Sequence, residues 1–281
     1  MHPKQFLQKM ALARNFKSST RFSSFFSGKT FIPPVPNSQL INSRNDNNYL
    51  YKIQFQKVKP SLHQDYKDLY AEYLPKIIKE SDRKEHVASF MTWYGSQDEA
   101  VHLWRYKGNY SAHKFSNSSK AKSLDEDYTK FREERGKMLV SRRNDLVFEF
   151  GFCPQISNFK AQQDQSIIDG KFDSDSNMVY EFRQYELKPG RLSDWNGQWN
   201  KVFQSKIRGH DNDFVGGFFT DIGKLNTIYY IWAYPSLEDR KNMRDKAWMH
   251  DDWASVVTET QDCCESMSSQ IMLPMMHSPL Q

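Results

Sequence analysis

The sequence predicts an α+β fold in which one β–α–β–β–α–β unit occurs twice in tandem. Strand-like and helix-like hydrophobic patterns follow one another in the same order in both halves of the chain. A Lys-Pro pair ends the first strand of each half, at residues 59–60 and 188–189. The segments HLWRY at 102–106 and YIWAY at 230–234 place Trp and Tyr at matching positions of the two halves. This order of elements is that of a ferredoxin-like unit.

The first unit is expected over residues 49–152. Alternating apolar residues predict a half-buried strand over 51–55. Apolar residues at helical spacing then predict a helix over 62–77, which Pro75 should kink or shorten. The remaining elements are a hairpin with strands over 86–94 and 100–106, a charged helix over 124–138 and a closing strand over 145–152.

Residues 153–177 are polar and are expected to connect the two units, and the second unit is expected over residues 178–281. A Gly-Gly pair at 216–217 lies inside a strand pattern, which indicates a bulge or a close approach of backbone. Ser236 and Asp239 fit a capping box at the start of the last helix. The other elements are a strand over 178–187, a helix over 191–208 and a hairpin around Gly223 with strands over 214–221 and 227–234. A final strand is expected over about 267–273.

The strand at 228–234 predicts how the two sheets are arranged. Both of its alternating faces are apolar or aromatic, so both must be covered. We expect helices of the same unit on one face and the sheet of the other unit on the opposite face. The two sheets then face each other in a barrel with the helices outside.

Charge divides the chain into a basic N-terminal segment and a nearly neutral body. Residues 1–45 contain seven Lys and Arg residues and no Asp or Glu. The rest of the chain has slightly more acidic than basic residues, which argues against a nucleic-acid-binding protein. The composition of residues 1–45 predicts a mitochondrial presequence followed by a disordered linker, with a processing site near Arg21. We therefore expect a mitochondrial protein, most simply in the matrix.

The cysteines and the apolar runs exclude several other classes. The three cysteines, Cys153, Cys263 and Cys264, have neither a disulfide framework nor a zinc-site spacing. The longest apolar run, residues 228–234, is too short to span a bilayer. No Walker A, dinucleotide-binding or nucleophile-elbow pattern occurs, so the sequence predicts no catalytic residues, no metal and no cofactor.

His102 is the weak candidate for a cofactor ligand. It shares a strand face with Trp104 and Tyr106, and a neutral imidazole in an aromatic cavity can ligate haem iron. The simpler interpretation is a buried histidine that bonds a polar neighbour, and Tyr230 occupies the matching position of the second unit.

A candidate partner-binding motif lies in the second unit. Asp251, Asp252, Trp253 and Val256 resemble the acidic–aromatic–x–x–aliphatic peptide that docks by strand addition to ubiquitin-like autophagy proteins. Residues 66–69 fit the same pattern more loosely. Both segments fall on predicted helices, where their aromatic residues are suited to the core.

Several segments in order along residues 49–281 resemble the NipSnap family. They are TWYG at 92–95, AVHLWRY at 100–106, FREERGKMLVSRRN at 131–144, YEFRQYELKPG at 180–190, GGFF at 216–219, IWAY at 231–234 and SPLQ at 278–281. The resemblance implies a mitochondrial protein with tandem units of the dimeric α/β-barrel type. It also implies a role in mitochondrial quality control, in which the protein gathers on damaged mitochondria and recruits autophagy adaptors and ubiquitin-like autophagy proteins. It supplies no catalytic residue set, and it leaves a homo-oligomer open.

Two functions from different classes follow from the sequence. The first is a non-enzymatic mitochondrial interaction protein that acts in mitophagy signalling. The alternative is a ligand-binding or monooxygenase-like α+β barrel that holds a small molecule or haem.

Overall fold

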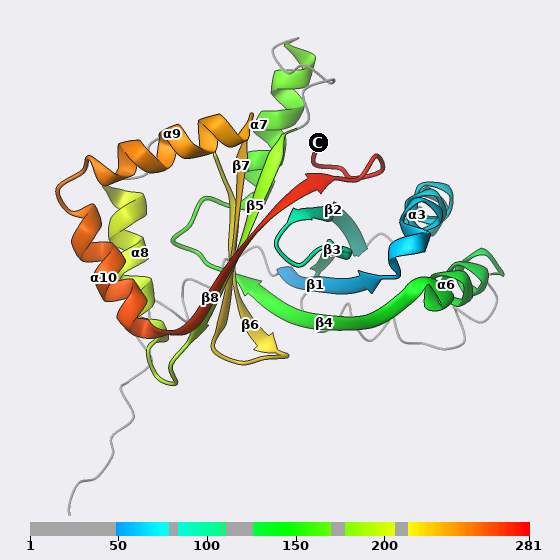
Figure 1. The fold of residues 1–281 in the computed structure, drawn as a ribbon, viewed down its shortest axis with the longest axis horizontal. Coiled ribbons are helices and arrows are strands. Elements are labelled where there is room, and N and C mark those ends of the chain that lie inside the picture. The colour runs from blue at the N-terminus through cyan, green and yellow to red at the C-terminus, as the bar shows by residue number, and fades with distance from the viewer. Residues whose placement is uncertain (1–48, 79–83, 109, 111–125, 170–177, 206–212) are drawn as a thin grey trace, which may run out of the picture. The chain divides into compact units, whose positions relative to one another are not determined.

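Eight antiparallel strands form one closed barrel in the part of the chain that the computed structural model describes, which is residues 49–78, 84–108, 110, 126–169, 178–205 and 213–281 (Figure 1). The strands are β1 (Tyr49–Val58), β2 (Lys84–Tyr94), β3 (Glu99–Lys107), β4 (Leu139–Glu149), β5 (Val179–Leu187), β6 (Phe214–Ile222), β7 (Thr227–Tyr234) and β8 (Cys264–Pro274). The helices are the 3-10 turn η2 (Pro60–Leu62), α3 (His63–Ile78), α6 (Glu126–Met138), α7 (Ile156–Ile168), α8 (Leu192–Gln204), α9 (Leu237–Trp248) and α10 (Trp253–Cys263). The predicted presequence and linker, residues 1–45, lie outside the described residues.

The barrel consists of two four-stranded halves with the same strand order. The first half runs β4-β1-β3-β2 and the second runs β8-β5-β7-β6. The halves join at two seams, where β2 pairs with β8 and β4 pairs with β6, all antiparallel. Trp104 and Trp232 lie on the third strand of their halves, β3 and β7, and both face helices. The predicted α+β fold of two ferredoxin-like units in a barrel with external helices is therefore confirmed.

Aromatic side chains fill the interior of the barrel. On β1, Tyr51 and Phe55 point inward, and Phe55 packs against Phe182 of β5 and Tyr229 of β7 with ring centroids 5.8 and 5.7 Å apart. Leu280, near the C-terminus, is also fully buried in this interior cluster. Since the side chains of a strand alternate between its two faces, the opposite faces of the same strands are left to the helices.

Helices cover the outer face of each half. Helices α3 and α6 pack together over the first half, and α8 and α10 pack together over the second (Figure 1). Strand β7 is buried on both sides, as predicted: Tyr229 and Ile231 face the interior, whereas Tyr230 and Trp232 face the helices. Pro75 does not end α3, which continues to Ile78, although the proline has no N–H to donate to the carbonyl four residues earlier.

Some element boundaries differ from those predicted. Strand β4 begins at Leu139, directly after α6, rather than at residue 145. The last helix is divided into α9 and α10, and the side-chain oxygen of Ser236 caps α9 by accepting the backbone N–H of Asp239 at 3.1 Å. The segment expected as a connection, residues 153–177, contains α7. Its polar sequence gives little helical signal, and two of its apolar residues, Ile156 and Phe159, are buried in the barrel cluster. No helix in the described ranges is long and apolar enough to cross a membrane.

The Gly-Gly pair in β6 has the packing role that was expected. The register of β6 against β7 shifts between Phe214 and Gly216, which marks a bulge. A Cβ atom on Gly217 would lie 2.8 Å from Tyr230 Cε1 and 3.1 Å from Phe214 Cζ. Both neighbours are rigid rings in the core, so any side chain at 217 must displace one of them.

Gly217→Ala should therefore destabilise the protein by about 1–3 kcal/mol, the usual cost of overpacking a core. Gly197→Ala is the matched control, because this glycine lies inside α8 with no atom within 4 Å of an added Cβ. It should raise the free energy of unfolding by up to about 1 kcal/mol, since alanine is the better helix former. Urea unfolding of both variants tests this, and equal effects at the two sites would contradict the packing explanation.

A buried carboxylate joins the barrel to α7. Glu149 at the end of β4 accepts the Tyr51 hydroxyl at 2.8 Å and the backbone N–H of Ile156, at the start of α7, at 2.7 Å. Burial raises the pKa of Glu149 to about 7, although these two hydrogen bonds and the charge of Arg105 act in the opposite direction. The folded protein therefore binds a proton at Glu149 more tightly than the unfolded chain does.

This raised pKa predicts a pH dependence of stability. The contribution of protonated Glu149 is fully present below its ordinary pKa of 4.5 and is lost as the pH rises through about 7. Over that window wild type should lose up to about 3 kcal/mol relative to Glu149→Gln, which cannot ionise. Urea unfolding of both proteins between pH 4 and pH 8 measures the difference. A difference that does not change with pH would show that folding leaves the pKa of Glu149 at its ordinary value.

Candidate functional site

His102 lies in β3, fully buried between the first half of the barrel and α3. The hydroxyl oxygen of Tyr66 in α3 is 2.7 Å from its Nε2, and the hydroxyl oxygen of Ser89 in β2 is 2.6 Å from its Nδ1. The ring of Tyr70 stacks on the imidazole, with centroids 4.4 Å apart and planes 4° from parallel. Both ring nitrogens of His102 therefore have a hydrogen-bonding partner.

These hydrogen bonds form a chain with one direction. Tyr66 donates its proton to Gln56 Oε1 at 2.8 Å, so its oxygen must accept the Nε2–H of His102. The Nδ1 atom of His102 then carries the lone pair and accepts the Ser89 hydroxyl proton. The Ser89 oxygen in turn accepts from Nε2–H of His86, 2.7 Å away. The hydrogen-bond network thus assigns the lone pair of His86 to its Nδ1 atom.

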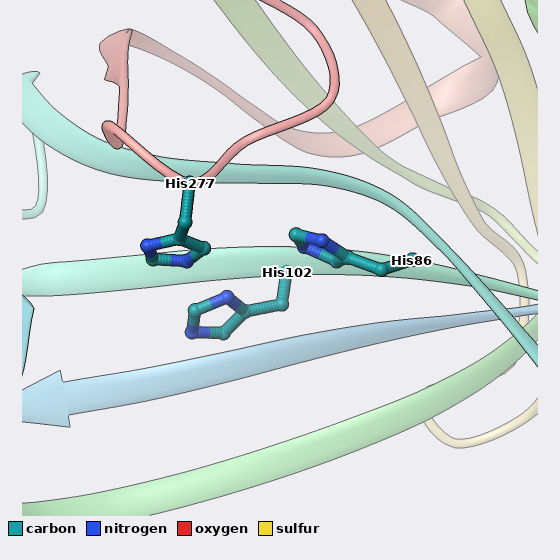
Figure 2. A group of neighbouring side chains, drawn as sticks. All are labelled: His86, His102 and His277. Atoms are coloured by element: carbon teal, nitrogen blue, oxygen red, sulfur yellow. The ribbon is translucent and has the colours of Figure 1, made fainter. Parts of the chain in front are cut away.

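A third imidazole approaches the first two from the C-terminal segment. His277 follows β8, and one nitrogen from each of His86, His102 and His277 lies within 4.8 Å of the others. Figure 2 shows His277 projecting from the C-terminal segment toward His102 and His86. His86 Nδ1 and His277 Nε2 are buried atoms without a hydrogen-bond partner in the described structure.

Backbone hydrogen bonds hold the C-terminal segment against β2 on both sides of His277. The Met275 N–H donates to the carbonyl of Ser89 at 2.9 Å, and the Ser89 N–H donates to Ser278 Oγ at 3.0 Å. Farther along, the carbonyl of Gln281 accepts the hydroxyl of Tyr180 at 2.8 Å. The position of His277 is therefore set by β2 and by the barrel interior together.

The surroundings keep all three imidazoles neutral. Burial lowers the pKa of His86 to about 3 and of His277 to about 4, and it lowers the pKa of His102 well below its usual range. For His86 the neighbouring His277 adds to this effect, whereas the Ala88 backbone opposes it. Neutral imidazoles carry the lone pairs that metal ions require.

The residues of the candidate partner-binding motif lie elsewhere, at the start of α10. Trp253 is 8% exposed and Val256 is 5% exposed, and both belong to the core between the second half of the barrel and its helices. Asp251 and Asp252 are exposed. In the second segment of this kind, Tyr66 is fully buried. Strand addition at either place requires the helix to unwind, because its aromatic anchor belongs to the core.

Haem fits poorly at His102. A haem axial ligand needs an open space beside it that admits the macrocycle, yet the side chain of His102 is fully buried. The cavities of about 580, 310 and 160 Å³ in the described structure are lined by other residues. The three adjacent imidazoles are better suited to a single small ion than to a macrocycle.

The sequence singled out His102 but neither of its neighbours. His86 could have been found from the predicted hairpin, because β2 pairs with β3 and His86 lies opposite Trp104, two residues from His102. No local signal points to His277, which lies far along the chain in an irregular segment after β8. Only the pairing of β2 with β8 brings this segment to the first half of the barrel.

Comparison with known proteins identifies the relatives of this chain. The NIPSNAP family profile matches residues 180–279. NipSnap homolog 1 of Danio rerio is 38% identical over 274 residues, covering 96% of this chain and 91% of the relative. NipSnap homolog 2 of Homo sapiens is 35% identical, covering 87% of this chain and 79% of the relative.

Solved structures show the same fold in more distant proteins. A presumed monooxygenase from Fusobacterium nucleatum covers 82% of this chain and 94% of its own, with a TM-score of 0.55 and 10% identity. One from Lactobacillus acidophilus covers 81% of this chain and 94% of its own, with a TM-score of 0.53 and 10% identity. At this level of identity the likeness concerns the fold alone. The sequence relatives, which match nearly the whole chain, show that it belongs to the NipSnap family.

Proposed function

We propose that this chain is a non-enzymatic mitochondrial interaction protein that acts in mitochondrial quality control. In this proposal the folded barrel is a platform that recruits autophagy adaptors and ubiquitin-like autophagy proteins to damaged mitochondria. The observation that carries the proposal is the filled interior of the barrel, considered together with membership of the NipSnap family.

A filled barrel is suited to a platform and poorly suited to catalysis. Enzyme sites need a concave space that accepts a substrate and positions it against reactive groups. Here the inward-facing rings of Tyr51, Phe55, Phe182 and Tyr229 occupy the interior, together with Leu280 from the C-terminal segment. The residues that fill it are apolar and aromatic, and they stabilise the fold by packing.

Location supplies the signal in this proposal. Import into mitochondria depends on the membrane potential acting on positive charge, and residues 1–45 contain seven such charges and no acid. In healthy mitochondria the chain is imported and hidden from the cytosol. When the potential falls, import stops and the folded platform remains exposed at the surface.

The partner surface must be compatible with the folded state. The partner-binding role of Asp251, Asp252, Trp253 and Val256 remains a prediction. Because Trp253 and Val256 belong to the core, α10 must unwind if these residues bind by strand addition. A partner that binds the intact fold would use exposed residues instead, such as Asp251 and Asp252.

The alternative is a barrel that binds a small molecule or haem, and its support is the likeness in fold to presumed monooxygenases. The geometry around His102 does not favour haem. A polar cavity of about 310 Å³ at one end of the barrel, lined in part by Lys57, Arg143 and Gln184, is the place for a small ligand. A small molecule that remains bound to the protein through purification would favour this ligand-binding alternative.

Residues 1–45 should direct a fluorescent reporter to mitochondria. Replacing five of the basic residues with Gln, at Lys4, Lys9, Arg14, Lys17 and Arg21, should leave the reporter in the cytosol, because import requires positive charge. Replacing the same number of Ser residues in this segment is the control and should preserve import. Continued import of the Gln variant would refute the presequence.

Depolarising mitochondria should raise the fraction of this protein that an external protease can digest while the outer membrane is intact. A resident matrix protein that was imported beforehand serves as the control and should stay protected. The comparison is made by immunoblot before and after addition of an uncoupler. If the accessible fraction does not change, failed import does not expose the protein at the surface. The ligand-binding alternative then becomes the better explanation.

A further inference from the structure

Two of the three histidines in the cluster, His86 and His277, have a buried ring nitrogen without a hydrogen-bond partner in the described structure. The direction of the hydrogen-bond chain leaves the lone pair of His86 on Nδ1, which is buried and has no partner among the described residues. His86 is only 4% exposed, so water does not readily supply a hydrogen bond in place of that partner. The Nε2 atom of His277 is also buried without a partner in the part of the chain that the structure describes. Leaving such atoms unpaired costs free energy, and a bound cation would recover it.

The spacing of the nitrogens is close to that of a metal site. Three nitrogens at the corners of a triangle with sides of 4.8 Å have a centre roughly 2.8 Å from each, whereas zinc–nitrogen bonds are about 2.0–2.1 Å long. Each ring must therefore move inward by less than about 1 Å. His277 is on an irregular segment and only half-buried, so it can make the largest part of this movement.

The groups around the cluster have the arrangement that supports metal ligands. A ligating imidazole usually donates its other N–H to a fixed oxygen, which sets its tautomer and orientation. His86 donates Nε2–H to Ser89, and His102 donates Nε2–H to Tyr66. At His102 the Ser89 oxygen must leave Nδ1, which requires the Ser89 side chain to rotate about its Cα–Cβ bond.

We propose that His86, His102 and His277 bind one divalent first-row transition-metal ion of the zinc class. Imidazole ligands suit zinc, copper, nickel and iron, whereas magnesium and calcium prefer oxygen ligands. The positive charges of Lys52 and Arg135, which act on His102, favour an anion as the fourth ligand. This site is independent of the proposed platform function.

Metal binding would fasten the C-terminal segment to the first half of the barrel. His86 and His102 are fixed on β2 and β3, whereas His277 follows β8 and connects through Gln281 to Tyr180 of β5. The ion would therefore crosslink the two halves of the barrel near the seam between β2 and β8. Its expected effect is greater stability of the segment 275–281 and of this seam.

The test is a titration of the full-length, metal-free protein with zinc chloride, followed by calorimetry. Wild type should bind one equivalent, and His277→Ala should bind at least about tenfold more weakly, because one of three ligands is lost. His250→Ala is the matched control: it removes a half-exposed histidine between α9 and α10 and should leave zinc affinity unchanged. His277 is not in the main core, so the variant is expected to fold, and circular dichroism of the metal-free protein verifies this.

Two further measurements separate this site from the cysteines. Cobalt(II) in wild type should give the visible absorption of a nitrogen-rich four-coordinate site without the strong charge-transfer bands of thiolate ligands, and His277→Ala should lose it. Zinc should also slow hydrogen exchange of residues 275–280 in wild type and in His250→Ala, but not in His277→Ala. Equal zinc affinity of His277→Ala and His250→Ala, or thiolate bands in wild type, would overturn the proposal.

Discussion

Closure of the sheet is the constraint on which the rest of this structure depends. Each four-stranded half, taken alone, would expose two edges of unpaired backbone groups and one apolar face. Pairing of β2 with β8 and of β4 with β6 satisfies both pairs of edges at once. The same closure turns the two apolar faces toward each other, so that aromatic rings from both halves meet in the interior. The halves are thus not separable domains in the energetic sense, because each completes the hydrogen bonding and the core of the other.

Closure also determines what the barrel can do. The interior is occupied largely by rings such as Phe55, Phe182 and Tyr229, and the layer between each half and its helices holds further polar groups. In the first half this layer holds the chain of hydrogen bonds through Tyr66, His102 and Ser89. In the second half Tyr230 lies in the corresponding layer, where its hydroxyl oxygen accepts the Nε1–H of Trp195 at 3.1 Å among aromatic rings. The duplication therefore preserves the fold while the two outer layers differ in chemistry.

Buried charge in the second half illustrates the same division between the layers. Glu181 of β5 is fully buried and pairs with Arg183 at 2.8 Å and with Arg240 of α9 at 2.7 Å. Although burial alone raises the pKa of a carboxyl group, these guanidinium groups hold the pKa of Glu181 well below its usual range. The ion pairs tie α9 to the sheet, as Glu149 ties α7 to β4. Both contacts use a buried carboxyl group, but their surroundings shift the two pKa values in opposite directions.

The sequence by itself determined the order of the elements, the duplication and the two-sided burial of β7, because alternation and helical periodicity are local properties of the chain. It also marked His102 and the Gly-Gly pair of β6 as unusual. Tertiary structure alone decided which strands pair at the two seams, the placement of α7, and the meeting of His86, His102 and His277. These depend on pairing between strands far apart in the chain, such as β2 with β8, and no local pattern encodes such contacts. Trp253 is a further example. Its motif is recognised from a few neighbouring residues, but its burial depends on α8 and the sheet, which are distant in sequence.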